Sequence, residues 1–333
     1  MIRRPPRSTL DRSSAASDVY KRQDLALDSN ERIYVLGRGH DYDTRGTRIT
    51  VMDMNEEYYG TFASYGQDDG QFMWPSSIVI SDSDKIYVSD EYSHKISIMT
   101  LEGEFISSFG QLGNEDGEFD GPNGLIFDNK NQLYVVDHRN GRIQVFDESG
   151  NFIRKFSSQG NNEGQLNLPW GITYTSEDRL YVSDWGNHRI QEFSTDGEFI
   201  RSFGSKGEEE QNILHPSSCA VDDLGNIYVC DWGNHKLKVF DKEGNFLCSN
   251  RGEGSLSKWA QDFLDTNVQE KEARLKADLV FELESFKDDP FTESSHVEKL
   301  FWCPTSISFH NDNLLIVDSS RHRIQVFNTV QKL

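Results

Sequence analysis

Two stretches of this 333-residue chain place several chemically capable side chains close together. YVSDWGNHRI at 181–190 and YVCDWGNHKL at 228–237 each contain an Asp, a Trp, an Asn, a His and a basic residue. Carboxylate and imidazole groups at such spacing could hold a metal ion or act as general acid and base. Whether the set performs such chemistry or has a structural role depends on whether it occurs once in the chain or is repeated in several places.

The set is part of a 47-residue repeat. The frames at Tyr87, Tyr134, Tyr181 and Tyr228 read YVSD, YVVD, YVSD and YVCD, each 47 residues after the one before. Two related frames begin at Tyr34 and Leu315, where the period is lengthened by six and by 40 residues. Self-similarity at a fixed period of this size indicates a repeat architecture.

Each period predicts four short strands. In one period GLIFD at 124–128, QLYVVD at 132–137 and RIQVFD at 142–147 are separated by polar turns, and a Gly-containing turn leads into FIRKF. Four antiparallel strands in such a period describe one blade of a propeller. We therefore predict an all-β fold: a six-bladed β-propeller of four-stranded antiparallel blades over 24–333, with one helical insertion between blades 5 and 6.

The residues of the repeat resemble a known family. FGQLGNEDGEFDGPNGL at 109–125, followed by YVVD and NGRIQVF, is similar to the NHL repeat of six-bladed propellers, and the resemblance covers residues 24–333. Members of this family include recognition propellers of tripartite-motif ubiquitin ligases, sensor domains of bacterial receptors and a peptide-amidating lyase. The resemblance therefore implies the fold and leaves the function open.

The repetition favours a structural role for the Asp-containing loops. In five blades an Asp begins the loop after the second strand, and a basic residue ends it five positions later. Equivalent positions in successive blades lie far apart, so they cannot converge on one metal ion or one substrate. We expect the Asp to cap the turn and pair with a base. The main residues of this motif are Asp90, Asp137, Asp184, Asp231, Asp318, Arg142, Arg189, Lys236 and Arg323.

The same loops should surround the mouth of the central channel. A proline opens each of five blades, and the residue after it is expected to flank the mouth: Ser76, Asn123, Trp170, Ser217 and Thr305. These side chains suit ligand binding, whereas a propeller lyase or lactonase would be expected to present metal ligands there. We predict no catalytic residue, no metal site and no cofactor. Calcium at acidic loops such as GNEDG at 113–117 is the less favoured alternative.

Two insertions fall in adjacent blades. One lies in GRGHDYDTRGT at 37–47, and the larger one spans about 251–300. Helical spacing of Trp259 with Phe263, and of Leu275, Leu279, Leu283 and Phe286, predicts helices in the larger insertion, with a capping box at Ser295 and Glu298. These helices either pack on the blades or form a lid and partner-docking platform at the mouth. The expected docking residues are His40, Trp259, Phe263 and Phe286.

Residues 1–23 lie outside the repeat. They are Arg- and Ser-rich and aperiodic, and they resemble a translated adaptor or vector sequence more than a transit peptide. At the other end only six residues follow RIQVF at 323–327, so a fourth strand of the last blade is not expected and ring closure is in question. The sequence does not indicate a cellular compartment. No stretch is long and apolar enough to cross a membrane.

The net charge of the chain limits the classes of partner that it is expected to bind. A net charge of −21 disfavours binding to nucleic acid or to an anionic membrane surface. We expect a monomer that binds a protein or a small ligand. The favoured function is a non-catalytic recognition or scaffold propeller, similar to the substrate-recognition propellers of tripartite-motif ubiquitin ligases. The alternative is a metal-dependent lyase or hydrolase of the six-bladed propeller type, with candidate ligands His40, Asp41, Asp43 and His296.

Overall fold

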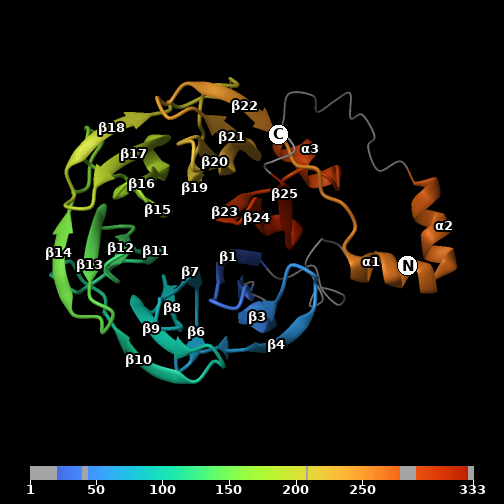
Figure 1. The fold of residues 1–333 in the computed structure, drawn as a ribbon, viewed down its shortest axis with the longest axis horizontal. Helices are drawn as coiled ribbons and strands as arrows, with labels where there is room; N and C mark the ends of the chain where they lie inside the picture. The colour runs from blue at the N-terminus through green and yellow to red at the C-terminus, as the bar shows by residue number, and fades with distance from the viewer. Residues whose placement is uncertain (1–20, 40–43, 208, 278–289, 329–333) are drawn as a thin grey trace.

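A computed structural model describes residues 21–39, 44–207, 209–277 and 290–328. Its main strands form six sheets, and Figure 1 shows these sheets arranged in a ring. Five sheets have four antiparallel strands, and the sixth has three strands among the described residues. The predicted all-β, six-bladed propeller is therefore confirmed.

Each blade is a meander whose strands follow the order of the chain. The first blade consists of β1 (Lys21–Leu27), β2 (Ile33–Arg38), β3 (Arg48–Met52) and β4 (Tyr58–Phe62). The second consists of β7 (Pro75–Ile80), β8 (Lys85–Asp90), β9 (Lys95–Thr100) and β10 (Phe105–Phe109). The third consists of β11 (Pro122–Phe127), β12 (Leu133–Asp137), β13 (Arg142–Phe146) and β14 (Phe152–Phe156). A short parallel pair, β5 (Ser64–Tyr65) with β6 (Gln71–Phe72), lies between the first two blades.

The other three blades follow the same plan. They are β15 (Ile172–Thr175), β16 (Arg179–Asp184), β17 (Arg189–Ser194) and β18 (Phe199–Phe203); β19 (Pro216–Val221), β20 (Ile227–Asp231), β21 (Lys236–Phe240) and β22 (Phe246–Asn250); and β23 (Pro304–His310), β24 (Asn313–Asp318) and β25 (Arg323–Asn328). Strand β1 thus begins three residues before the boundary expected at Asp24.

The repeated proline marks one face of the ring. Pro122 opens the inner strand β11 and pairs with Asp137, the last residue of β12. The first position of a strand is one of the few that tolerate proline, because proline donates no ladder hydrogen bond. The proline ends of the inner strands and the Asp-containing loops therefore share one face, which we call the Asp face.

Hydrophobic side chains fill the seams between neighbouring blades. Six clusters of buried residues occur, one in each seam; Tyr134, Ile143 and Val182 belong to the cluster between the third and fourth blades. Each buried aliphatic side chain contributes roughly 1.5–3 kcal/mol. The cluster that contains Leu25 and Val317 joins the sixth blade to the first. The ring, whose closure the sequence left in question, is closed by this seam.

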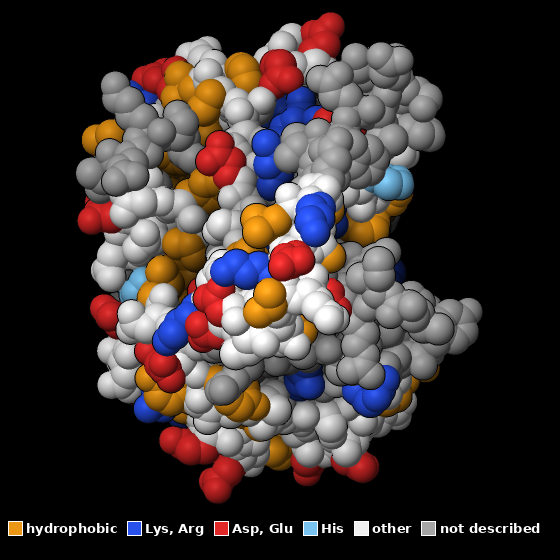
Figure 2. Space-filling model, turned by 90° about the vertical axis from the view of Figure 1, so that its right-hand side faces the viewer, with side chains coloured by type: hydrophobic (Ala, Val, Ile, Leu, Met, Phe, Trp, Pro, Cys, Tyr) orange, Lys and Arg blue, Asp and Glu red, His pale blue; other side chains and the backbone are white. Residues whose placement is uncertain are grey.

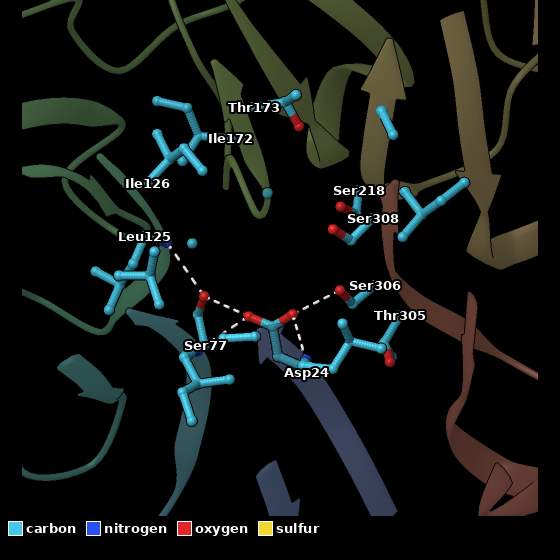
Figure 3. Close-up of a pocket in the computed structure, with 18 of the residues that line it drawn as sticks. Asp24, Ser77, Leu125, Ile126, Ile172, Thr173, Ser218, Thr305, Ser306 and Ser308 are labelled. Atoms are coloured by element: carbon cyan, nitrogen blue, oxygen red, sulfur yellow. Dashed lines mark hydrogen bonds between the residues drawn. The ribbon is translucent and has the colours of Figure 1, made fainter. Parts of the chain in front are cut away.

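A carboxylate ties the same junction from the channel side. Figure 3 shows Asp24 of β1 pointing toward Ser77 of the second blade and Ser306 of the sixth. Its oxygens accept hydrogen bonds from the Ser77 hydroxyl at 2.6 Å, the Ser306 hydroxyl at 2.5 Å and the Ile78 N–H at 3.0 Å. Burial raises the pKa of Asp24 in spite of these donors. One side chain thus connects three consecutive blades.

The helical excursion lies between the fifth and sixth blades, as predicted. It contains α1 (Lys258–Thr266), α2 (Val268–Lys276) and α3 (Pro290–His296). Helix α1 is capped by Ser257, whose hydroxyl oxygen accepts a hydrogen bond from the Ala260 N–H at 3.1 Å. The Lys258 N–H donates to Glu56 of the hairpin between β3 and β4 at 2.9 Å, so the excursion reaches the first blade.

Two helices of the excursion lie away from the channel. Helices α1 and α2 lie outside the ring rather than across its channel (Figure 1). Figure 2 shows their side of the molecule, where acidic, basic and hydrophobic side chains are intermixed. The expected capping box is wrong, because Ser295 lies in the last turn of α3 and its hydroxyl donates to the Thr292 carbonyl at 2.8 Å. Among the described residues, no helix is long and apolar enough to span a bilayer.

Candidate ligand-binding site at the channel mouth

The repeated Asp organises the loops of the Asp face. In the third blade Asp137 accepts hydrogen bonds from the Asp120 N–H at 2.8 Å and from Arg142 Nε at 2.7 Å. The Arg142 guanidinium also donates to the carbonyl oxygens of Glu115 and Glu118, at 2.9 and 3.0 Å. The same Asp–Arg pairs, each at 2.8 Å, are Asp184 with Arg189 and Asp318 with Arg323. The hydrogen bonds and ion pairs of these carboxylates therefore hold the loops in place.

The second blade keeps the Asp without an Arg at the end of the loop. Asp90 instead accepts hydrogen bonds from four backbone N–H groups, at distances between 2.6 and 3.1 Å. These donors belong to Met73, Trp74, Tyr92 and Ser93. Backbone donors thus compensate this buried charge where a guanidinium is missing.

The fifth blade departs from the expected pairing. Asp231 and Lys238, both fully buried, lie 3.0 Å apart, whereas Lys236 contacts Glu210 at 2.7 Å. Lys238 also donates to the carbonyl oxygen of Glu209 at 3.3 Å, so its ammonium reaches the interblade loop as Arg142 does in the third blade. The Asp231–Lys236 pair expected from the spacing is replaced, because Lys238 provides the nearer cation from inside the sheet.

The repeated His connects one blade to the next. The residues His94, His188 and His235 have φ values of 55°, 57° and 54°, in the left-handed region. Nδ1 of each accepts a hydrogen bond from the N–H of the residue before the next proline: Gly121 at 3.1 Å, His215 at 3.2 Å and Cys303 at 3.0 Å. In the third blade Gly141 occupies this position, with φ of 61°. The imidazoles are thus engaged in seam contacts.

The structure brings the five expected mouth residues to the lining of the central channel, a cavity of about 420 Å³. Two of them bond within the wall: the Ser217 hydroxyl donates to the Pro304 carbonyl at 2.9 Å, and the Ser76 hydroxyl to the Pro122 carbonyl at 3.4 Å. Asn123 Oδ1 and Thr305 Oγ1 have no hydrogen-bond partner within the described part of the chain. Ligand binding by these residues stays a prediction.

A second cavity of about 440 Å³ opens at the mouth, and we call it the mouth cavity. Its wall in the fourth and fifth blades is aromatic. Trp170, Trp185 and Trp232 lie with ring centroids 6.3 Å apart in every pair, tilted by 38° to 55°. His215 stacks on Trp185 with a centroid distance of 3.9 Å. We call the three indoles the Trp cup.

The opposite wall of the mouth cavity is polar and comes from the first three blades. Arg38 lies 3.6 Å from Glu91, and its guanidinium stacks over the Trp74 ring at 4.7 Å. Burial lowers the pKa of His138, whose Nδ1 lies 2.9 Å from the Pro169 carbonyl oxygen. Glu91 also contacts Arg139, which in turn lies 3.3 Å from Asp120. This wall therefore combines a balanced cluster of ion pairs with an imidazole that is neutral near pH 7.

Sequence reasoning missed most of this cavity. The residue that follows the structural Asp lines the cavity in five blades, and it takes four different types there: Glu91, His138, Trp185, Trp232 and Ser319. Variation at one position of an otherwise regular motif is the signal that could have identified these side chains. Trp170 alone was expected among the members of the Trp cup.

Several expected site residues, or their side chains, lie outside the described part of the chain. His40, Asp41, Asp43 and Phe286 lie outside the described residues, as do Leu279 and Leu283 of the helical stripe. Trp259 belongs to α1, but its side chain is not described; Phe263 of the same helix is 36% exposed. His296 is exposed at the end of α3.

Metal binding has no assembled site in the described part of the chain. No group of three or more His, Cys, Asp and Glu side chains there could hold an ion. In the acidic loop at 113–117 the Asn114 and Glu115 carbonyl oxygens accept hydrogen bonds from Arg142, at 2.6 and 2.9 Å. Calcium at such loops stays a prediction, and it would have to compete with this guanidinium.

Comparison with solved structures supports the fold. A streptogramin B lyase matches with a TM-score of 0.55 and 11% identity, over 94% of this chain and 84% of the other. A protein of unknown function from Bacteroides thetaiotaomicron gives 0.62 and 16%, over 97% and 73%. A nidogen/laminin complex gives 0.52 and 19%, over 68% and 79%. At such identities the likeness concerns the fold alone.

Comparison with protein families identifies the repeat itself. No curated protein sequence gave a significant match. The family model of the NHL repeat matches residues 119–146, 166–193, 214–240 and 301–327, which lie in the third to sixth blades. The chain therefore carries four NHL repeats within a six-bladed β-propeller.

Proposed function

We propose that this propeller is a non-catalytic recognition module that binds a small ligand, or a side chain of a protein partner, in the mouth cavity. One observation carries the proposal. The cavity sets the Trp cup against a polar wall, and its lining varies between blades at the position after an otherwise constant structural Asp. Concave sites that combine aromatic walls with a few polar groups are typical of ligand binding.

The surroundings of the cavity also favour binding over catalysis. The motif Asp and His side chains on this face are engaged in bonds that fix the loops, as for Asp137 with Arg142 and His188 with His215. Such bonds make a rigid rim and leave these groups poorly placed to exchange protons with a substrate. The lyase or hydrolase alternative has two supports: the candidate ligands His40, Asp41 and Asp43, which lie outside the described residues, and the fold shared with the streptogramin B lyase.

Thermal-shift screening of a fragment library tests the proposal. The wild type would be compared with the double variant Trp170→Ala/Trp232→Ala, after circular dichroism has shown that both are folded. Fragments that stabilise the wild type and not the variant support binding in the mouth cavity. Equal stabilisation of both proteins places the site elsewhere and overturns the proposal.

Mass spectrometry of each fragment after incubation separates recognition from catalysis. Recovery of the fragment unchanged supports a recognition module. Conversion of a fragment by the wild type, lost in the double variant, would favour the enzyme alternative. Metal analysis of the same purified protein would then show whether an ion accompanies that activity.

A further inference from the structure

We infer that the Trp cup receives a compact organic cation that carries a methylated ammonium group. The inference rests on the proposed function and names the chemistry of the ligand. It follows from the shape of the cup, from the way this chain uses its other indoles, and from the charge balance around the mouth cavity.

The shape of the Trp cup favours a compact group. The three indole planes are inclined to one another by 38°, 48° and 55°, with all centroid distances at 6.3 Å. A flat ring could lie parallel to only one of these planes. A roughly spherical group such as trimethylammonium can contact three inclined rings at once, as in the aromatic cages that bind quaternary ammonium ions.

The other indoles of the Asp face show what this chain places on a tryptophan. The Arg38 guanidinium lies 4.7 Å from the Trp74 ring centroid, and the Arg321 guanidinium lies 5.5 Å from that of Trp302. Within the described part of the chain, no cation is stacked on the members of the Trp cup. A ligand cation would complete the pattern, because an indole is the aromatic side chain that attracts cations most strongly.

The charges near the cup permit a cation to bind. Arg38, the basic side chain in the cavity lining, shares Glu91 with Arg139, and Arg139 also contacts Asp120 at 3.3 Å, so two guanidinium groups are balanced by two carboxylates. Burial keeps the His138 imidazole neutral by lowering its pKa. The chain as a whole carries a net charge of −21, which attracts cations and repels anions at low ionic strength. The unpartnered Asn123 Oδ1 and Thr305 Oγ1 lie in the same lining and could bond a polar substituent of the ligand.

Choline and its uncharged isostere 3,3-dimethylbutan-1-ol provide the decisive pair of probes. The two molecules have the same shape, so a difference in affinity measures the contribution of the positive charge. Isothermal titration calorimetry at low salt should show choline binding at least about tenfold more tightly, the factor expected from ~1.4 kcal/mol of cation–π attraction. Equal affinity for the two probes overturns the inference.

Single variants locate the binding. Trp170→Leu and Trp232→Leu should each weaken choline binding by about tenfold or more, since each removes one aromatic face. Trp302→Leu is the matched control, because that indole lies on the same face outside the cavity and already carries Arg321. The Trp302→Leu variant should bind choline with the same affinity as the wild type. Equal losses in all three variants would overturn the assignment to the Trp cup.

A peptide distinguishes the two sources of a methylated ammonium group. The pentapeptide Gly-Ala-Lys(trimethyl)-Ala-Gly would be compared with choline and with the unmethylated peptide. Preference for the methylated peptide over choline points to a modified protein, and the reverse preference points to a small metabolite. If neither cation binds while fragments from the thermal-shift screen still require Trp170 and Trp232, the inference is wrong and the proposed function stands.

Discussion

Nδ1 of His188 accepts a hydrogen bond from the backbone N–H of His215, 3.2 Å away in the next blade. This contact explains why a His recurs at the end of the Asp-containing loop. The residue lies in the left-handed region, with φ of 57°, and from there its ring reaches the loop that precedes the neighbouring inner strand. The bond connects two blades at the rim of the channel, so its loss should affect the seam rather than any chemistry.

Replacing His188 with Ala should lower the free energy of unfolding by about 1–2 kcal/mol. The His215 N–H loses its acceptor, and Ala is also less tolerant than His of a positive φ. Urea denaturation gives the stability. His188→Asn is the control, since Asn tolerates the left-handed region and retains a side-chain acceptor. Bound metal and mouth-cavity ligands should be unchanged; loss of either in His188→Ala would contradict a structural role.

The same His should make the propeller acid-sensitive. Burial, together with the neighbouring His215 and Lys206, lowers the pKa of His188 from 6.5 to about 4. Because the folded state holds the proton less tightly than the unfolded chain, the stabilisation is complete above pH 6.5 and is lost as the pH falls toward 4. The stability of the wild type relative to His188→Asn, which does not titrate, should therefore fall over this range. A difference that is constant with pH would disprove this linkage.

The buried pair of Lys238 and Asp231 should be intolerant of losing its cation. In Lys238→Met the Asp231 carboxylate stays buried without a positive partner, which costs about 3–5 kcal/mol. Both side chains are fully buried at 3.0 Å, so solvent cannot replace the ammonium. Denaturation by guanidinium chloride measures the loss. A loss below about 1 kcal/mol would show that the pair contributes little.

The fourth blade shows which side chains could replace Lys238 as partners of the buried Asp. There Gln191 donates to Asp184 at 2.9 Å, and Arg189 provides the charge at 2.8 Å. The double variant Lys236→Arg/Lys238→Gln would copy this arrangement into the fifth blade. We expect its stability within about 1 kcal/mol of the wild type. Failure of the rescue would mean that the two blades differ in more than these two side chains.

Asp24 should hold the first, second and sixth blades together. Asp24→Ala removes the acceptor for Ser77, Ser306 and Ile78, and we expect a loss of about 3 kcal/mol in unfolding free energy. A double-mutant cycle with Ser306→Ala should give a coupling of about 1 kcal/mol, measured by urea denaturation. Ser218→Ala is the control, because this hydroxyl lines the same channel (Figure 3) without a hydrogen-bond partner in the described residues. If the effects of Asp24→Ala and Ser306→Ala are additive, the hydrogen bond between these residues does not hold the blades together.

Much of the fold could be predicted because the repeat constrains it at several levels. The proline, the YVxD frame and the alternating third strand recur together, and they dictate an inner strand, a buried second strand and a half-buried third. Ring closure was harder to foresee. It depends on Asp24 meeting Ser306 across 282 residues of sequence, a contact that no local pattern reports.

The candidate site was less predictable, because it is built from exceptions to the repeat. Trp185 and Trp232 stand inside the motif that marks architecture, so their shared cup with Trp170 is visible only when the loops are placed in space. Lys238 similarly replaces a Gln of the neighbouring blades, and only burial next to Asp231 reveals its role. The position of α1 could not be read from its apolar spacing, which indicates a helix but not the surface that it covers.

Removing α1 and α2 should leave ligand binding at the mouth intact. Both helices lie outside the ring (Figure 1), and α1 contacts the hairpin of the first blade through Lys258 and Glu56. The variant would replace residues 258–289 with a Gly/Ser linker of about 12 residues, which can reach ~40 Å when extended. We expect an affinity within about twofold of wild type for any mouth-cavity ligand. Stability should fall modestly, since the buried Ala260 and Leu264 are lost.

A longer deletion separates this helix pair from α3. Removing 256–299 also removes the Ser294 and Val297 carbonyl oxygens, which accept hydrogen bonds from the buried guanidinium of Arg321. That charge would remain buried with fewer acceptors, so the longer deletion should destabilise the sixth blade by several kcal/mol more than the shorter one. Chemical denaturation of both variants, followed by calorimetry with the same ligand, tests the difference. If the shorter deletion abolishes binding while the blades stay folded, the excursion controls access to the mouth after all.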